Sequence, residues 1–338
     1  MRYSLKALIA LAISVITIAM IFKITNVQIT VSDIKKLDFR YIAIAFLLQF
    51  SFWLLWALRL KIITETLGKR LRFLSSLEIT LSSMFFAAIT PSSAGGEPIR
   101  AKLIGDICKS YGTASAVVLI ERLLDAMFFA VALPILVIIT DFSIGFGFKV
   151  AGIFSVSLVG FLFILYLLFK DPERLDKLII YINYKILRKF LGSRVNAMTE
   201  KTLKEAHNFR NALIEIINAK KSSTTLIILI TIFMWILGFL IPSFILLAMD
   251  KDPVYLLSIT AQLIIVVVSL IPLTPGSSGI AEGSMAYLYS NFVPSNVLGV
   301  LVAIWRFITY YLNLLFGFIV SLKILKISSH SPRLQHQN

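Results

Sequence analysis

The chain has few of the residues that soluble catalytic and metal-binding sites use. Its 338 residues include one cysteine, Cys108, and three histidines, His207, His330 and His336, each of which lies in a polar segment. A single cysteine excludes an intramolecular disulfide, and three scattered histidines do not predict a metal site. The phosphate-binding loop of nucleotide-driven motors is absent. The sequence therefore predicts neither a metal site nor a cofactor.

Charged residues are also scarce, at 15% of the chain, whereas 58% of the residues are hydrophobic. Soluble domains are roughly 45–50% apolar and about 25% charged. Several apolar runs with few or no charges are long enough to cross a bilayer, which takes about 20 residues. The sequence therefore predicts an all-α polytopic membrane protein, in the cytoplasmic membrane of the cell.

The basic residues set the predicted orientation. The net charge of +15 is concentrated at the N-terminus, in 59–72, in 170–221 and in the C-terminal tail. Basic loops of membrane proteins face the cytoplasm, so this distribution explains the charge without a nucleic-acid partner and places both termini inside. We expect six spans, at residues 5–22, 41–58, 112–139, 149–169, 223–249 and 297–322.

Two similar polar phrases each follow an apolar run: TPSSAGGE at 90–97 and TPGSSGIAE at 274–282. Proline, glycine and serine at membrane depth need partners other than lipid for the backbone groups they free. We expect re-entrant helical hairpins at 76–108, with its mouth inside, and at 254–290. The second segment either re-enters from outside or crosses twice, and its likeness to the first favours the hairpin.

The two phrases belong to a longer repeat. Thr90 precedes Arg122 by 32 residues, and Thr274 precedes Arg306 by 32 residues, with Glu97 and Glu282 placed 25 and 24 residues before those arginines. The predicted topology places the two units in opposite directions across the membrane. An inverted repeat of this kind is common in secondary transporters, where it places a site near the bilayer midplane.

Each part of the repeat has a physical role at such a site. Glycines let the backbone turn, serines can cap the outgoing helix, and a helix N-terminus with an arginine suits phosphate. The stripe Arg306, Tyr310 and Asn313 shares one helix face, and Gln49 and Gln262 can line a pathway or bond between helices. The candidate substrate-binding residues are Ser92, Ser93, Gly95, Gly96, Glu97, Arg100, Glu121, Arg122, Asp125, Ser277, Ser278, Gly279, Glu282, Arg306 and Tyr310.

The intramembrane charges leave two interpretations open. An ionised residue at mid-helix costs about 2.5–3.5 kcal/mol on insertion scales, so these groups must face one another or water. They are either internal salt bridges that only hold the hairpins or part of a polar path.

These motifs resemble a known family. TPSSAGGEPIRAKLI, the ERLLD run at 121–125, PLTPGSSGIAEGSMAYLY and the Trp-Arg pair at 305–306 resemble the flippase-like membrane domain family. That family includes the membrane half of lysylphosphatidylglycerol synthetase and the membrane region of an archaeal glycosyltransferase. The resemblance implies a flippase-like domain over 1–325 that moves a lipid headgroup between leaflets. The soluble catalytic domains of those relatives have no counterpart here, so their enzymatic activities are not carried over.

We therefore expect a transporter of membrane lipids with a phosphate-bearing headgroup, and not an enzyme. Arg122 and Arg306 would hold the phosphate, and Glu97 and Glu282 would balance them. The alternatives are an integral-membrane headgroup transferase that uses Glu97, Glu121 and Asp125, or a scaffold for a partner enzyme. A homo-oligomer is compatible with each of them.

Segment 171–221 is predicted to be a cytoplasmic amphipathic helical insertion, and 326–338 a disordered cytoplasmic tail. Leu175, Leu178 and Ile182 share one face of its first helix, and a second helix is expected at about 199–219. The pair either packs on the membrane domain or lies on anionic headgroups.

Overall fold

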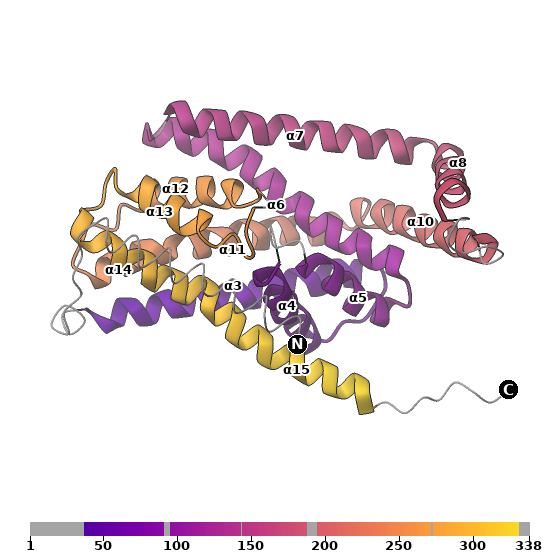
Figure 1. The fold of residues 1–338 in the computed structure, drawn as a ribbon, viewed down its shortest axis with the longest axis horizontal. Helices are drawn as coiled ribbons and strands as arrows, with labels where there is room; N and C mark the ends of the chain where they lie inside the picture. The colour runs from indigo at the N-terminus through magenta and orange to yellow at the C-terminus, as the bar shows by residue number, and fades with distance from the viewer. Residues whose placement is uncertain (1–36, 91–94, 143, 188–194, 272, 331–338) are drawn as a thin grey trace.

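The computed structural model describes residues 37–90, 95–142, 144–187, 195–271 and 273–330, and this part of the chain is built from helices (Figure 1). Five helical segments are long and apolar enough to cross a membrane. They correspond to five of the six expected spans, and the expected span 5–22 lies outside the described residues. Their bounds are α3 Phe39–Thr66, α6 Tyr111–Thr140, α7 Ile144–Lys170, α11 Lys221–Ala248, and the run of α14 Ser295–Arg306, η3 Phe307–Tyr311 and α15 Leu312–His330.

Each polar phrase interrupts a pair of shorter helices, as predicted. Helix α4 (Phe73–Ala88) ends just before the first phrase, and α5 (Gly96–Cys108) begins at its end. Helix α12 (Tyr255–Val268) precedes the second phrase, and α13 (Ile280–Tyr289) follows it. The re-entrant course of these pairs and the orientation of the termini remain predictions.

The two interruptions contact each other. The Gly276 amide donates to the Thr90 carbonyl at 3.0 Å, and the Tyr310 hydroxyl donates to the Ala88 carbonyl at 2.9 Å. Gly276 has φ +56°, and a Cβ there would lie 2.4 Å from the Ala88 carbonyl oxygen. Glycine is therefore required for this approach, and the Thr90 and Ala88 carbonyls at the end of α4 are satisfied by protein groups rather than by lipid.

The long helices surround these interruptions. Helix α3 packs along α11, α15 packs on α4, and α6 contacts α5, α7 and α12. Helix α7 lies at the edge of the molecule (Figure 1), and little of its length is buried. Its exposed side chains are large and apolar, among them Ile153, Val156 and Phe163. Such a surface suits lipid, so the chain is a multi-pass membrane protein.

The segment expected to form an amphipathic insertion contains α8 (Pro172–Ile182), η1 (Asn183–Leu187) and α10 (Val195–Ile217). Helix α10 packs on α6 and buries Leu213 and Ile216 in a core shared with α3, α4 and α5. Helix α8 instead leaves Leu178 and Ile182 exposed. The packing interpretation thus fits α10, whereas α8 keeps an apolar face free.

Two polar contacts fix the start of α6 against α10. The Glu205 carboxylate accepts from the Gly112 amide and the Ser110 hydroxyl, each at 2.7 Å. A Cβ on Gly112 would lie 1.9 Å from the Glu205 carbonyl oxygen, so the crossing requires glycine. Burial raises the pKa of Glu205, but these hydrogen bonds outweigh burial and leave the pKa lowered.

The C-terminal segment differs from its prediction. Helix α15 continues to His330, into the segment 326–338 that was expected to be disordered. The apolar residues Leu325 and Ile327 extend the apolar run that precedes them, which favours continuation of the helix. Residues 331–338 lie outside the described part of the chain.

Candidate functional site

A cavity of about 330 Å³ lies where the two interrupted helix pairs meet. Its walls come from both repeats and from the long helices around them. Five of the residues predicted from the sequence line it: Glu97, Arg122, Ser277, Arg306 and Tyr310. Asn313, Gln49 and Gln262 line it as well, so the polar stripe of the last span faces the cavity as expected. The sequence therefore identified polar groups from both repeats that share one space.

The first Glu–Arg pair is open. Arg122 Nε lies 3.4 Å from Glu97 Oε1, and Arg122 Nη1 lies 3.3 Å from Asp125 Oδ2. The side chains of Arg122 and Glu97 are each 35% exposed. Arg122 Nε and Nη2 and Glu97 Oε2 have no hydrogen-bond partner among the described residues. These three atoms are themselves buried, so the pair has unused bonding capacity that a ligand reaches when the two side chains separate.

The second Glu–Arg pair is closed. Arg306 Nε donates to Glu282 Oε1 at 2.8 Å, and Arg306 Nη2 donates to the Gly276 carbonyl at 3.1 Å. The Arg306 guanidinium lies 4.1 Å from the Tyr310 ring centroid, and the side chains of Arg306 and Glu282 are buried. Arg306 thus holds the second interruption in place, and one edge of the Arg306 side chain lines the cavity.

The sequence had suggested that serines cap the helix after the second interruption, but the structure shows a different cap. The Gly279 amide donates to Glu282 Oε2 at 2.7 Å, so Glu282 caps α13. The Ser277 hydroxyl donates to the Ser269 carbonyl, and the Ser278 hydroxyl bonds Tyr310. A carboxylate already occupies this helix N-terminus, so the anion site predicted there is not available.

The first interruption is described only in part. Ser92 and Ser93 lie outside the described residues. The Gly95 amide donates to the Thr90 hydroxyl at 2.8 Å, and Gly96 packs against the Ser83 carbonyl. These two glycines form the start of α5 and do not line the cavity.

Three predicted binding residues instead lie behind the cavity wall. Arg100, Glu121 and Asp125 are buried and do not line the cavity. Arg100 Nη1 donates to Glu121 Oε2 at 2.8 Å, and its other nitrogens reach the Ser83 hydroxyl. Their charges are compensated by protein groups, because a lone buried charge is very costly. Of the three, Asp125 contacts Arg122, with Arg122 Nη1 at 3.3 Å from Asp125 Oδ2, so it helps to position Arg122.

Arg59 was expected in the cytoplasmic loop 59–72 and not at the site. It lies within α3, fully buried, and Arg59 Nη1 donates to Asp125 Oδ1 at 2.6 Å and to the Thr231 hydroxyl at 3.1 Å. Arg59 Nε lies 3.5 Å from Glu121 Oε1. A partial signal was present, because Leu60, Ile62 and Ile63 continue the apolar pattern beyond Arg59, although Lys61 interrupts it.

Tryptophans supply the other missed contacts. The Trp56 ring centroid lies 4.5 Å from the Arg100 guanidinium and 5.0 Å from that of Arg122. Trp56 Nε1 donates to Glu121 at 3.0 Å, and Trp235 Nε1 donates to Asp125 at 2.8 Å. Cation–π contacts and indole hydrogen bonds thus support the charged cluster from α3 and α11.

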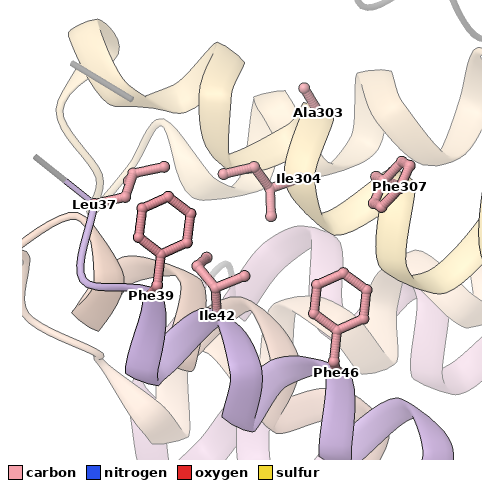
Figure 2. A pocket seen from close by; sticks show the side chains of 7 residues that line it. All are labelled: Leu37, Phe39, Ile42, Phe46, Ala303, Ile304 and Phe307. Atoms are coloured by element: carbon pink, nitrogen blue, oxygen red, sulfur yellow. The ribbon is translucent and has the colours of Figure 1, made fainter. Parts of the chain in front are cut away.

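A second recess is entirely different in character. Figure 2 shows an apolar groove between the start of α3 and the end of α14, lined by Phe39, Ile42, Phe46, Ile304 and Phe307 together with Leu37 and Ala303. None of these side chains carries a polar group. This groove therefore suits hydrocarbon and cannot hold a charged headgroup.

These features define a class: a multi-pass helical membrane protein with a cavity that is lined by charged side chains and lies between two interrupted helix pairs. The chain belongs to the lysylphosphatidylglycerol synthase TM region family, whose model matches residues 7–317. It is similar to a UPF0104 membrane protein of Archaeoglobus fulgidus, with 51% identity over 310 residues that cover 92% of this chain and 94% of that one.

More distant relatives cover the chain equally well. A UPF0104 membrane protein of Methanothermobacter thermautotrophicus is 25% identical over 316 residues, which cover 91% of this chain and 92% of the relative. A UPF0104 membrane protein of Methanocaldococcus jannaschii is 25% identical over 345 residues, which cover 94% of this chain and 95% of the relative. No solved structure matches the chain.

Proposed function

We propose that this protein is a lipid transporter of the flippase type, which moves a phosphate-bearing headgroup between the leaflets of the cytoplasmic membrane. The observation that carries this proposal is the open Glu97–Arg122 pair in the cavity. Arg122 Nε and Nη2 have no hydrogen-bond acceptor among the described residues. A guanidinium with free donors binds phosphate oxygens in a bidentate manner.

The surroundings of the cavity support transport. The two interruptions end at the same space, so small movements of either helix pair would change access to Arg122. The acyl chains would remain in lipid while the headgroup alone follows the polar path. The family name refers to a protein that acts on a phospholipid, which agrees with a headgroup as the ligand. We propose transport by this chain, without chemical change of the lipid.

Transport is measured in proteoliposomes that contain phospholipids with a fluorescent acyl chain, where a membrane-impermeant reductant bleaches the outer leaflet. Wild-type protein is expected to expose nearly all of the label, and Arg122→Gln to lower the rate at least tenfold, that is by about 1.4 kcal/mol or more. Arg40→Gln is the matched control, because Arg40 is exposed at the start of α3 and does not line the cavity.

Equal rates for wild type and Arg122→Gln, with both proteins monodisperse in detergent, would contradict the proposal. Mass spectrometry of the recovered lipid gives a second readout. An unchanged lipid mass is expected, and a covalently altered lipid would favour the transferase instead.

A further inference from the structure

The charged groups that line the cavity and those buried behind its wall form one cluster with equal numbers of arginines and carboxylates. The arginines are Arg59, Arg100, Arg122 and Arg306, and the carboxylates are Glu97, Glu121, Asp125 and Glu282. Among the described residues, the ion pairs of these eight groups join members of the set to one another. Four positive and four negative charges give this cluster a net charge of zero. A ligand with net charge would therefore enter without a compensating charge in the cluster.

The pairing inside the cluster is uneven. The Arg59–Asp125, Arg100–Glu121 and Arg306–Glu282 pairs have nitrogen–oxygen distances of 2.6, 2.8 and 2.8 Å. The Glu97–Arg122 pair has a distance of 3.4 Å and is the half-exposed one. A ligand would thus meet one cation and one anion that are loosely joined.

Phosphate binding by Arg122 has a consequence for Glu97. Among the described residues Arg122 is the single ion-pair partner given for Glu97, and Glu97 Oε2 already has no hydrogen bond. Asp125 keeps Arg59 as a partner when Arg122 turns toward a ligand, but Glu97 has no such substitute. A ligand that brings only a phosphate and displaces water from the cavity would therefore leave Glu97 without a compensating charge.

A ligand that also carries a cationic group supplies the charge partner that Glu97 would lack. Its phosphate satisfies Arg122, and its cationic group satisfies Glu97. The rings of Phe52, Trp235 and Phe239 line the same cavity, and aromatic faces attract ammonium groups.

Resting on the proposed function, we infer that the cavity holds a second, cationic subsite at Glu97 and that the transported lipid has a zwitterionic headgroup, with one phosphate and one amine or quaternary ammonium. Glu97 would select against anionic headgroups. Replacing Glu97 by glutamine adds one net positive charge to the cluster and moves its preference toward an anionic headgroup.

The test compares three phospholipids with identical labelled acyl chains in the proteoliposome assay: phosphatidylethanolamine, phosphatidylcholine and phosphatidylglycerol. Wild-type protein is expected to transport the two zwitterionic lipids at least about tenfold faster than phosphatidylglycerol. Glu97→Gln is expected to reduce this ratio by about tenfold while phosphatidylglycerol transport is kept or increased. Glu97→Asp keeps the charge and should keep the preference.

Glu78→Gln is the matched control, because Glu78 lies on α4, pairs with Lys323 at the surface and does not line the cavity. It should leave the ratio unchanged. Equal wild-type rates for zwitterionic and anionic lipids, or a ratio that Glu97→Gln leaves unchanged, would overturn the cationic subsite while the transport function stands. Transport of none of the three lipids by folded wild-type protein would overturn both. If the Glu97 variants fail to fold, the wild-type ratio alone decides.

Discussion

The two Glu–Arg pairs occupy corresponding positions after the two polar phrases, but their surroundings differ. Glu282 and Arg306 are buried at 2.8 Å, with Gly276 and Gly279 as further partners. Glu97 and Arg122 are half-exposed at 3.4 Å, and three of their polar atoms have no hydrogen bond. One motif thus forms a buried, hydrogen-bonded clamp in the second repeat and a longer, half-exposed pair that lines the cavity in the first.

The cost of desolvation explains why the same residues serve two purposes. A buried ion pair offsets the loss of water only with short distances and additional hydrogen bonds, which the second pair has. A half-exposed pair keeps part of its hydration and exchanges partners at low cost. The first pair can therefore accept a ligand without disrupting the fold.

The largest predicted effect concerns stability. Glu282→Gln should lower the free energy of unfolding by about 3–5 kcal/mol, because it leaves Arg306 buried with an unpaired charge and weakens the α13 cap. Glu97→Gln should cost about 1 kcal/mol or less, because its pair is half-exposed. Denaturant or thermal unfolding in one detergent measures both variants. Equal losses would remove the distinction between clamp and open pair.

The contact between the two interruptions gives the next effect. Gly276→Ala should cost about 1–3 kcal/mol, because its Cβ would collide with the Ala88 carbonyl at a positive φ. Gly283→Ala on α13 meets open space, so it should be neutral or stabilising by up to about 1 kcal/mol. The same unfolding measurement tests both. A Gly276→Ala protein as stable as wild type would mean that the two breaks do not need this approach.

Much of this arrangement was predictable from sequence, and the reasons are local. The long spans follow from apolar runs, and the interruptions follow from Pro91 and the glycines around Gly276. The equal spacing pointed to Arg122 and Arg306 as counterparts, and each forms an ion pair with the glutamate of its phrase, although the spacing did not show that one pair is closed. The α13 cap was also readable, because Glu282 stands three residues after Gly279, in the capping-box position.

Other features depend on contacts that sequence periodicity does not encode. Arg59 reaches Asp125 and Thr231 on two other helices, and Trp56 reaches Glu121. Which helix faces which is decided by packing across the whole bundle, so these partners could not be assigned from one sequence. Counting basic residues also favoured a loop position for Arg59, since Lys61 and other basic residues follow it.

The smallest predicted effect lies outside both pairs, where Glu205 fixes the start of α6, the helix that carries Arg122. Because the folded pKa of Glu205 is lowered, its contribution is complete above its ordinary pKa and is lost as the pH falls through the lowered value. Glu205→Gln should remove this pH-dependent contribution to the stability of the contact between α10 and α6, which is about 1 kcal/mol. Amide hydrogen exchange in α10 at pH 7 and at acidic pH measures it.

That experiment also extends the comparison, because acid should loosen the contact of α10 with the start of α6, the helix that carries Arg122. If wild type and Glu205→Gln showed the same pH dependence of exchange in α10, the carboxylate would not be the group that holds α10 on α6.

The most direct test of the central claim is lipid binding itself. Native mass spectrometry of protein released from detergent, after incubation with phosphatidylethanolamine, counts the lipids that remain bound. The account predicts one retained lipid for wild type and for Arg40→Gln, and loss of that lipid in Arg122→Gln while the protein stays folded. Equal retention in wild type and Arg122→Gln would contradict the claim that Arg122 binds the headgroup.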